Sequence, residues 1–208
     1  MCGIAGLIHR GSTSKVGFEL QVMLQALKHR GEDSTGNALY GKTDGQNFIM
    51  RFKVGENVGE GSTSIMEDVS VYDERKKIVD GYLAGLGAKI LKEERILPYS
   101  LRYEIEYDKD LMEFSQKIES VQGVEILSMG KSLEVIKDLG NAEAVCKRYS
   151  LDKVIGTHAI GHARMATESG VDIKSAHPFW GYPFSDVSVV HNGQLTNYWN
   201  NRRVLENK

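Results

Sequence analysis

The chain has 208 residues and a formal net charge of −2, and 41% of its residues are hydrophobic and 26% charged. This length suits one large domain or a domain with an inserted subdomain, and the near-neutral charge gives no electrostatic basis for binding nucleic acid or an anionic membrane. The chain shows neither a signal peptide nor a run of ~18 apolar residues that could span a membrane, and its two cysteines argue against a disulfide scaffold and favour a cytoplasmic protein.

The opening segment is predicted to form a strand, a helix and a hairpin. Residues 3–9 have the composition of a short, fully buried strand. Residues 12–14 (Ser-Thr-Ser) offer an N-cap to a helix over residues 16–27, where apolar side chains recur at helical spacing. Residues 37–41 and 45–53 are predicted to pair as a hairpin, because an Asp-Gly turn signal lies between them.

The middle of the chain is predicted to be an insert. Its expected elements are a helix over residues 74–95, a strand over 101–107, a helix over 110–121, a hairpin of 124–128 with 133–136, and a helix over 141–149. From residue 101 onward the order is strand, helix, strand, strand and helix, which is typical of a compact α+β unit. The glycine- and histidine-rich character of the opening segment returns near residue 155. We therefore predict a main domain of residues 1–70 and 155–208, interrupted by an α+β subdomain of residues 71–154.

Position two holds the most informative residue of the chain. Cys2 follows the initiator Met1, and a small residue there usually allows removal of the methionine, which would leave cysteine at the N-terminus. Such a residue carries a thiol and a free α-amine that is partly neutral near neutral pH. The neutral amine can accept the thiol proton, as in nucleophiles activated by their own N-terminus. Taken alone, Cys2 would more simply open a buried strand, and the motifs further along favour the nucleophile.

Four motifs carry a resemblance to a known family. In chain order they are Met1-Cys2-Gly3-Ile4-Ala5-Gly6, His29-Arg30-Gly31-Glu32-Asp33-Ser34-Thr35-Gly36, Gly161-His162-Ala163-Arg164-Met165-Ala166-Thr167 and Val189-Val190-His191-Asn192-Gly193, with Ala176-His177-Pro178 between the last two. Together they resemble the class II glutamine amidotransferases, whose glutaminase domain is an N-terminal-nucleophile hydrolase. The resemblance covers about the first 55 and the last 50 residues. The long insert is similar to that of free-standing glutamate synthase-type subunits.

The resemblance implies an α+β fold, an αββα sandwich, and a role for each of five residues. Cys2 would supply the nucleophilic thiolate, and its α-amine would carry the proton. Asn192 and Gly193 would form the oxyanion hole from a side-chain amide and a backbone N–H. Arg164 would bind the α-carboxylate of glutamine, and Thr167 would add a hydroxyl contact. Seen alone, the Asn-Gly pair would be a hairpin turn and the arginine a surface ion-pair partner.

Three histidines invite a metal hypothesis, which the sequence does not favour. The spacing of His162, His177 and His191 resembles no zinc pattern, and no cysteine or carboxylate pair accompanies them. The resemblance gives these histidines structural roles, and no cofactor motif occurs in the chain. We therefore expect neither a metal nor a cofactor here.

One element of the family pattern is absent. Family members carry an aspartate beyond the Asn-Gly motif that binds the α-amino group of the substrate, and this chain ends at Lys208 before that position. Residues 195–205 are predicted to begin the helix that follows the motif. The sandwich is therefore expected to be incomplete, and an open sheet favours pairing with a partner or with a second copy.

The leading functional hypothesis is a glutaminase that hydrolyses glutamine to glutamate and ammonia through a thioester on Cys2. The ammonia would pass to a synthase partner, a flavin and iron–sulfur subunit that makes glutamate or a related amino acid. Two alternatives stay open: a non-catalytic regulatory or binding module that retains the amidotransferase fold, and an amidase that acts on other amides.

Overall fold

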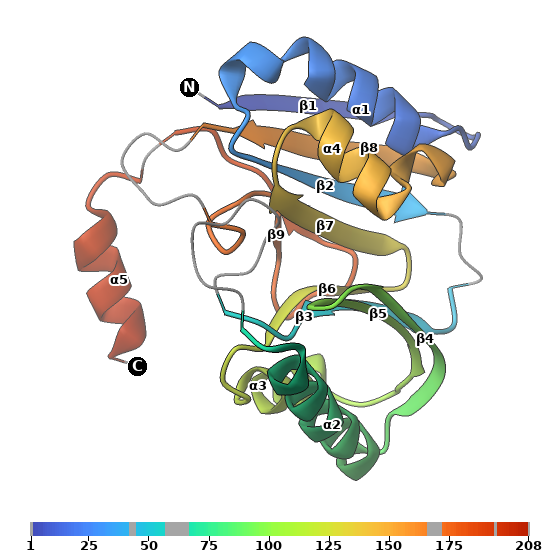
Figure 1. The fold of residues 1–208 in the computed structure, drawn as a ribbon, viewed down its shortest axis with the longest axis vertical. Coiled ribbons are helices and arrows are strands. Elements are labelled where there is room, and N and C mark those ends of the chain that lie inside the picture. Colours follow the sequence, from blue (N-terminus) through green and yellow to red (C-terminus); the bar gives the residue numbers. More distant parts are fainter. Residues whose placement is uncertain (1, 42–44, 57–66, 166–171, 194, 208) are drawn as a thin grey trace.

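The computed structural model describes residues 2–41, 45–56, 67–165, 172–193 and 195–207, which form a mixed α/β structure with antiparallel sheets (Figure 1). Sheet A has the strand order β1 (Gly3–Ile8), β8 (Gly156–Arg164), β2 (Ser34–Gly41) and β7 (Leu133–Leu139). Sheet B has the order β4 (Lys89–Leu97), β5 (Ser100–Glu106), β3 (Phe48–Lys53) and β6 (Glu125–Gly130). Two short strands, β9 (Phe179–Trp180) and β10 (Ser188–Val189), form a separate hairpin.

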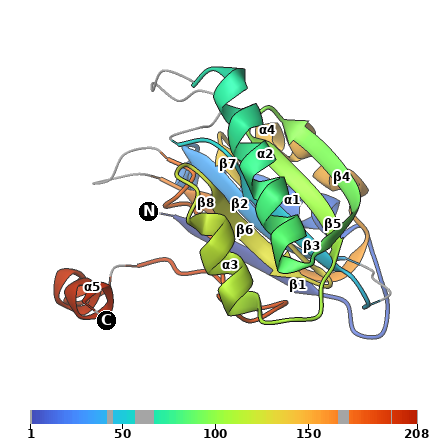
Figure 2. The same cartoon turned by 90° about the horizontal axis from the view of Figure 1, so that it is seen from below.

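The helices cover the outer faces of the two sheets. In Figure 1 the layers run from α1 (Val16–Ala26) and α4 (Ala142–Tyr149) through sheet A and sheet B to α2 (Val69–Leu86) and α3 (Leu111–Glu119). Figure 2 shows α2 and α3 lying across sheet B when the molecule is seen from below. The last helix, α5 (Tyr198–Glu206), extends away from this body and has no buried residue. Among the described residues, no helix combines the length and apolar character needed to cross a membrane.

Separate hydrophobic clusters hold the layers together. One cluster packs α1 and α4 on sheet A through Leu20, Leu24, Leu39, Ile136 and Cys146. A larger cluster packs α2 and α3 on sheet B and includes Phe52, Tyr72, Leu83, Tyr103 and Phe114. Burial of such large side chains stabilises each by roughly 1.5–3 kcal/mol, so both sheets have a core of their own.

The predicted hairpin of residues 37–41 and 45–53 is wrong. Strand β2 pairs with β7 and β8 in sheet A, whereas β3 pairs with β5 and β6 in sheet B. The first six residues of β2 are all buried, so both faces of that strand need cover. A two-stranded hairpin leaves its faces exposed, and the central place in sheet A therefore outweighs the local turn signal.

The predicted helix over residues 74–95 ends early. Helix α2 stops at Leu86, because Gly87 adopts a left-handed conformation with a φ of 81°. The chain then enters β4, an edge strand without a fully buried residue. The predicted cap at residues 12–14 is also wrong, since the N-cap of α1 is Lys15 and makes no side-chain hydrogen bond.

Several other elements agree with the sequence analysis. The predicted strand over 101–107 and the helices over 110–121 and 141–149 correspond to β5, α3 and α4, and Asn141 caps α4 by accepting a hydrogen bond from the backbone N–H of Ala144 at 3.0 Å. The predicted turn between 124–128 and 133–136 is present, but its strands β6 and β7 lie in different sheets. Sheet membership therefore differs from the predicted domain boundaries: β3 lies in sheet B, while β7 and α4 belong with sheet A.

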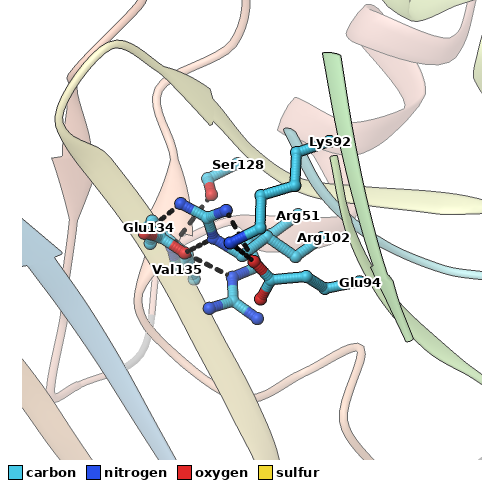
Figure 3. Close-up of polar contacts among 7 residues, drawn as sticks. All are labelled: Arg51, Lys92, Glu94, Arg102, Ser128, Glu134 and Val135. Carbon is cyan, nitrogen blue, oxygen red and sulfur yellow. Dashed lines mark hydrogen bonds and ion pairs between the residues drawn. The ribbon is translucent and has the colours of Figure 1, made fainter. Parts of the chain in front are cut away.

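A cluster of charged side chains joins the two sheets (Figure 3). Glu134 on β7 accepts hydrogen bonds from the Nε atoms of Arg51 on β3, at 2.6 Å, and of Arg102 on β5, at 2.9 Å. Glu94 approaches Arg102 at 3.5 Å and Lys92 at 2.6 Å. Burial would raise the pKa of Glu134, but the two arginines outweigh it and hold the pKa below its ordinary value. Glu134 is therefore ionised at neutral pH and forms a charged link between sheet A and sheet B.

Candidate active site

Strand pairing places Cys2 and Arg164 at one end of sheet A. In the antiparallel ladder of β1 and β8, Gly3 pairs with Ala163, so continuing the ladder by one residue puts Cys2 opposite Arg164. The Sγ atom of Cys2 lies 3.8 Å from the carbonyl oxygen of Met165, and Cys2 is partly exposed. Arg164 is only 6% exposed and donates from Nη1 to the carbonyl oxygen of Asp172 at 3.3 Å. The ladder thus places the partly exposed Cys2 and the buried Arg164 at the same end of sheet A.

Asn192 comes to the same place from the other end of the chain. Its Nδ2 atom donates a hydrogen bond to the carbonyl oxygen of Cys2 at 2.9 Å. Gly193 follows it, and a Cβ atom at this position would lie 2.9 Å from Nε2 of His191. Three of the predicted site residues, Cys2, Asn192 and Arg164, therefore gather at one end of sheet A, with Gly193 next in the chain. Thr167 lies outside the described residues.

Two glycines of the second motif allow close backbone contacts around this site. A Cβ atom at Gly31 would lie 2.3 Å from the carbonyl carbon of Arg164, and one at Gly36 would lie 1.9 Å from the carbonyl oxygen of His177. Asp33 also donates its backbone N–H to the carbonyl oxygen of Arg164 at 3.2 Å. The second motif therefore acts as a support for the backbone that carries Arg164 and His177.

Gly36→Ala is expected to lower the free energy of unfolding. The added methyl would overlap backbone atoms that cannot rotate away, so the loss should reach the upper end of the ~1–3 kcal/mol typical of overpacked cores. Gly81→Ala is the control, because a Cβ atom at this position of α2 meets nothing within 4 Å and alanine favours a helix by about 1 kcal/mol. Urea unfolding of both variants checks this, and a Gly36→Ala protein as stable as the wild type would contradict it.

Two histidines beside the site are neutral at physiological pH. His162 is 1% exposed, and its ring centroid lies 5.0 Å from that of His177 in an edge-to-face arrangement. Burial lowers the pKa of each to about 4, with a further contribution from the positive charge of Arg164. Both ring nitrogens of His162 are buried and have no hydrogen-bond partner among the described residues. In the part of the chain that the structure describes, no three His, Cys, Asp or Glu side chains are grouped so that they could hold a metal ion.

Comparison with known proteins shows similarity over the whole chain. No family model matches. A protein of Methanothermobacter thermautotrophicus, provisionally named glutamine amidotransferase, is 37% identical over 213 residues, which cover 100% of this chain and 66% of that protein. The glutamine amidotransferase-like protein GlxB of Rhizobium meliloti is 31% identical over 99% of this chain and 62% of its own length. The amidophosphoribosyltransferase of Methanocaldococcus jannaschii is 34% identical over 39% of this chain and 17% of its own length.

These relatives support a glutamine amidotransferase domain. The chain spans less than two thirds of the length of the two relatives that match it throughout. The similarity is therefore to one part of each of these two relatives.

The neighbourhood of these residues also includes a buried charge that the sequence analysis missed. Lys137 on β7 is buried and donates from Nζ to the carbonyl oxygen of Ala176 at 3.1 Å, which holds the segment leading to His177. Burial lowers the pKa of Lys137 to about 8. The available signal was a lysine at an inward position of an alternating apolar strand, between Val135 and Leu139.

Proposed function

We propose that the chain is the glutaminase part of a class II glutamine amidotransferase. The observation that carries the proposal is the 2.9 Å hydrogen bond from Nδ2 of Asn192 to the carbonyl oxygen of Cys2, which joins the last motif to the first. The fold thus brings together two residues that are 190 positions apart in the sequence, a candidate nucleophile and a candidate oxyanion donor. Arg164 beside them supplies the positive charge that a free amino acid substrate needs.

In the proposed reaction, removal of Met1 leaves Cys2 with a free α-amine. The Sγ atom bonds to the amide carbon of glutamine, the carbonyl takes up negative charge, and the α-amine accepts the thiol proton. The C–N bond then breaks, the same proton goes to the leaving nitrogen as ammonia departs, and a thioester remains. Water attacks the thioester carbon and releases glutamate, which returns the thiol to its starting state.

Asn192 can support this reaction without losing its contact to Cys2. A side-chain amide nitrogen carries two protons, and one of them is engaged by the carbonyl oxygen of Cys2. The second proton and the backbone N–H of Gly193 are the proposed oxyanion donors. Each such donor lowers the barrier by roughly 2.7–4 kcal/mol in other acyl-transfer enzymes.

The fold and the partner are proposed on the same basis. The order of helices, two antiparallel sheets and helices in Figure 1 supports the αββα arrangement of N-terminal-nucleophile hydrolases, and part of the chain is similar to amidophosphoribosyltransferases. Thr167 is proposed as a second contact to the α-carboxylate. Ammonia would pass to a synthase of the glutamate synthase type, and a second copy of the chain could pair along the open sheet.

A glutamine analogue that carries a diazoketone in place of the amide tests the proposal. It should label Cys2 and leave Cys146 unlabelled, and Arg164→Lys should slow labelling about 10- to 100-fold, because a planar bidentate contact to the α-carboxylate is lost. Iodoacetamide, which has no α-carboxylate, should alkylate Cys2 equally fast in both proteins. Arg202→Lys on the exposed α5 is the matched control. Glutamine binding without any labelling of Cys2 would contradict the proposal and favour the non-catalytic module.

A further inference from the structure

We propose that Asp186 is a positioning residue for the reaction: it fixes the β9–β10 hairpin to the β6–β7 turn and so holds Asn192 at Cys2. This inference rests on the proposed function. Asp186 lies in the loop between β9 and β10, outside every motif of the sequence analysis. Its importance is visible only in its contacts.

The carboxylate of Asp186 binds the whole β6–β7 turn. Oδ2 accepts the backbone N–H of Lys131 at 3.0 Å. Oδ1 accepts the backbone N–H of Ser132 at 2.7 Å, the hydroxyl of Ser132 at 2.9 Å and the backbone N–H of Leu133 at 2.8 Å. All four donors belong to one turn, and a carboxylate is the side-chain group that can accept all of them.

The backbone on both sides is shaped for this contact. Asp186 has a φ of 58°, a left-handed conformation that is uncommon outside glycine and that aspartate adopts more readily than most residues. Across the interface, a Cβ atom at Gly130 would lie 2.7 Å from Oδ1 of Asp186 and 3.1 Å from its backbone nitrogen. Gly130 therefore makes room for Asp186, and the two positions fit each other.

The electrostatics of the contact favour an ionised carboxylate. Partial burial would raise the pKa of Asp186, but the hydrogen bonds from Ser132, Lys131 and Leu133 outweigh it and hold the pKa below its ordinary value. The backbone N–H groups of the turn point toward one negative group, as in an anion-binding nest. An asparagine at this position would keep one acceptor oxygen, but it would lose the negative charge, and its NH₂ group would face an N–H donor of the turn in place of the second oxygen.

The β9–β10 hairpin connects Asp186 to the segment that carries Asn192. Gly181 donates its N–H to the carbonyl oxygen of Val187 at 2.8 Å, and Ser188 pairs with Trp180. The hydroxyl of Tyr40 on β2 contacts Oγ of Ser188 at 3.0 Å. Asn192 follows within six residues of Asp186, a span of at most roughly 20 Å. The hairpin is thus held at its turn by Asp186 and along β10 by Tyr40, and Asn192 follows β10 in the chain.

Asp186→Asn in the otherwise unchanged protein tests the inference. We expect hydrogen–deuterium exchange of residues 188–193 to become faster, and kcat for glutamine hydrolysis to fall about 10- to 100-fold with KM nearly unchanged, since misplacement by about 1 Å can cost 10²-fold. Alkylation of Cys2 by iodoacetamide should keep its rate, because it needs no oxyanion donor. Asn141→Ala is the control, because it removes the cap of α4 and lowers stability far from the hairpin.

The outcomes separate this inference from the proposed function. Absence of glutamine hydrolysis in the wild type would contradict the proposed function, and the inference with it. Wild-type turnover together with normal kcat in Asp186→Asn would overturn only the role of Asp186. An equal fall of kcat in Asn141→Ala would overturn it as well, because the loss would then follow stability and not the position of Asn192.

Discussion

Cys2→Ala is expected to abolish glutamine hydrolysis while leaving the fold intact. The variant has no thiol to form the thioester, and removal of a nucleophile from a hydrolase costs roughly 10⁶-fold in kcat. The fold should survive because Cys2 is partly exposed and its Sγ atom lies at a long distance, 3.8 Å, from the carbonyl oxygen of Met165. Ammonia release measures the activity, and thermal unfolding measures the fold.

Cys146→Ser is the matched control for this variant. Cys146 is buried on α4, and its Sγ atom contacts Oε1 of Gln21 at 2.9 Å, a contact that a hydroxyl can replace. The control should hydrolyse glutamine at the wild-type rate. Intact mass adds a second readout, because the proposed mechanism needs a chain without Met1. Turnover that persists in Cys2→Ala, or in protein that retains Met1 throughout, would contradict the assigned nucleophile.

The candidate site was more accessible to sequence analysis than the fold around it. The motifs pointed to Cys2, Arg164 and Asn192 before any of them was placed in space, because their resemblance to a known family implies a role for each. Their roles stay predictions, and the structure shows only that the three lie together. The motif glycines have a clear physical reason after the fact: Gly31 and Gly36 sit where a neighbouring backbone leaves no room for a Cβ atom.

The arrangement of the sheets could not be read from local patterns. The Asp-Gly signal after β2 suggested a hairpin, yet β2 and β3 separate into different sheets, because their partners come from residues 100–164. Periodicity shows which face of a strand is buried and leaves its neighbour unspecified. Asp186 and Glu134 were missed for the same reason, since a lone carboxylate in a loop or strand carries no signal until its distant partners are known.

Glu134→Ala is expected to cause the largest loss of stability. Glu134 is 19% exposed at its side chain and accepts hydrogen bonds from Arg51, which is 8% exposed, and from Arg102. Removal of one partner of a buried ion pair costs about 3–5 kcal/mol; here Arg51 would lose its 2.6 Å contact, while Arg102 would keep its 3.5 Å contact to Glu94. Among the residues that the structure describes, Nη1 of Arg51 has no hydrogen-bond partner even with Glu134 present. Urea unfolding at neutral pH measures the loss.

Glu206→Ala provides the contrast for this prediction. Glu206 pairs with Arg202 at 2.7 Å on α5, where the side chains are 57% and 48% exposed, and such a surface pair contributes only about 0.3–0.5 kcal/mol. The pKa of Glu134 in the folded protein is held below its ordinary value. Its contribution to the free energy of unfolding is therefore complete at a pH above the ordinary pKa, and it is lost as the pH falls through the lower pKa of the folded state. The stability difference between the wild type and Glu134→Ala should therefore shrink in acid. A Glu134→Ala protein that loses no more stability than Glu206→Ala would show that the charged link between the sheets is dispensable.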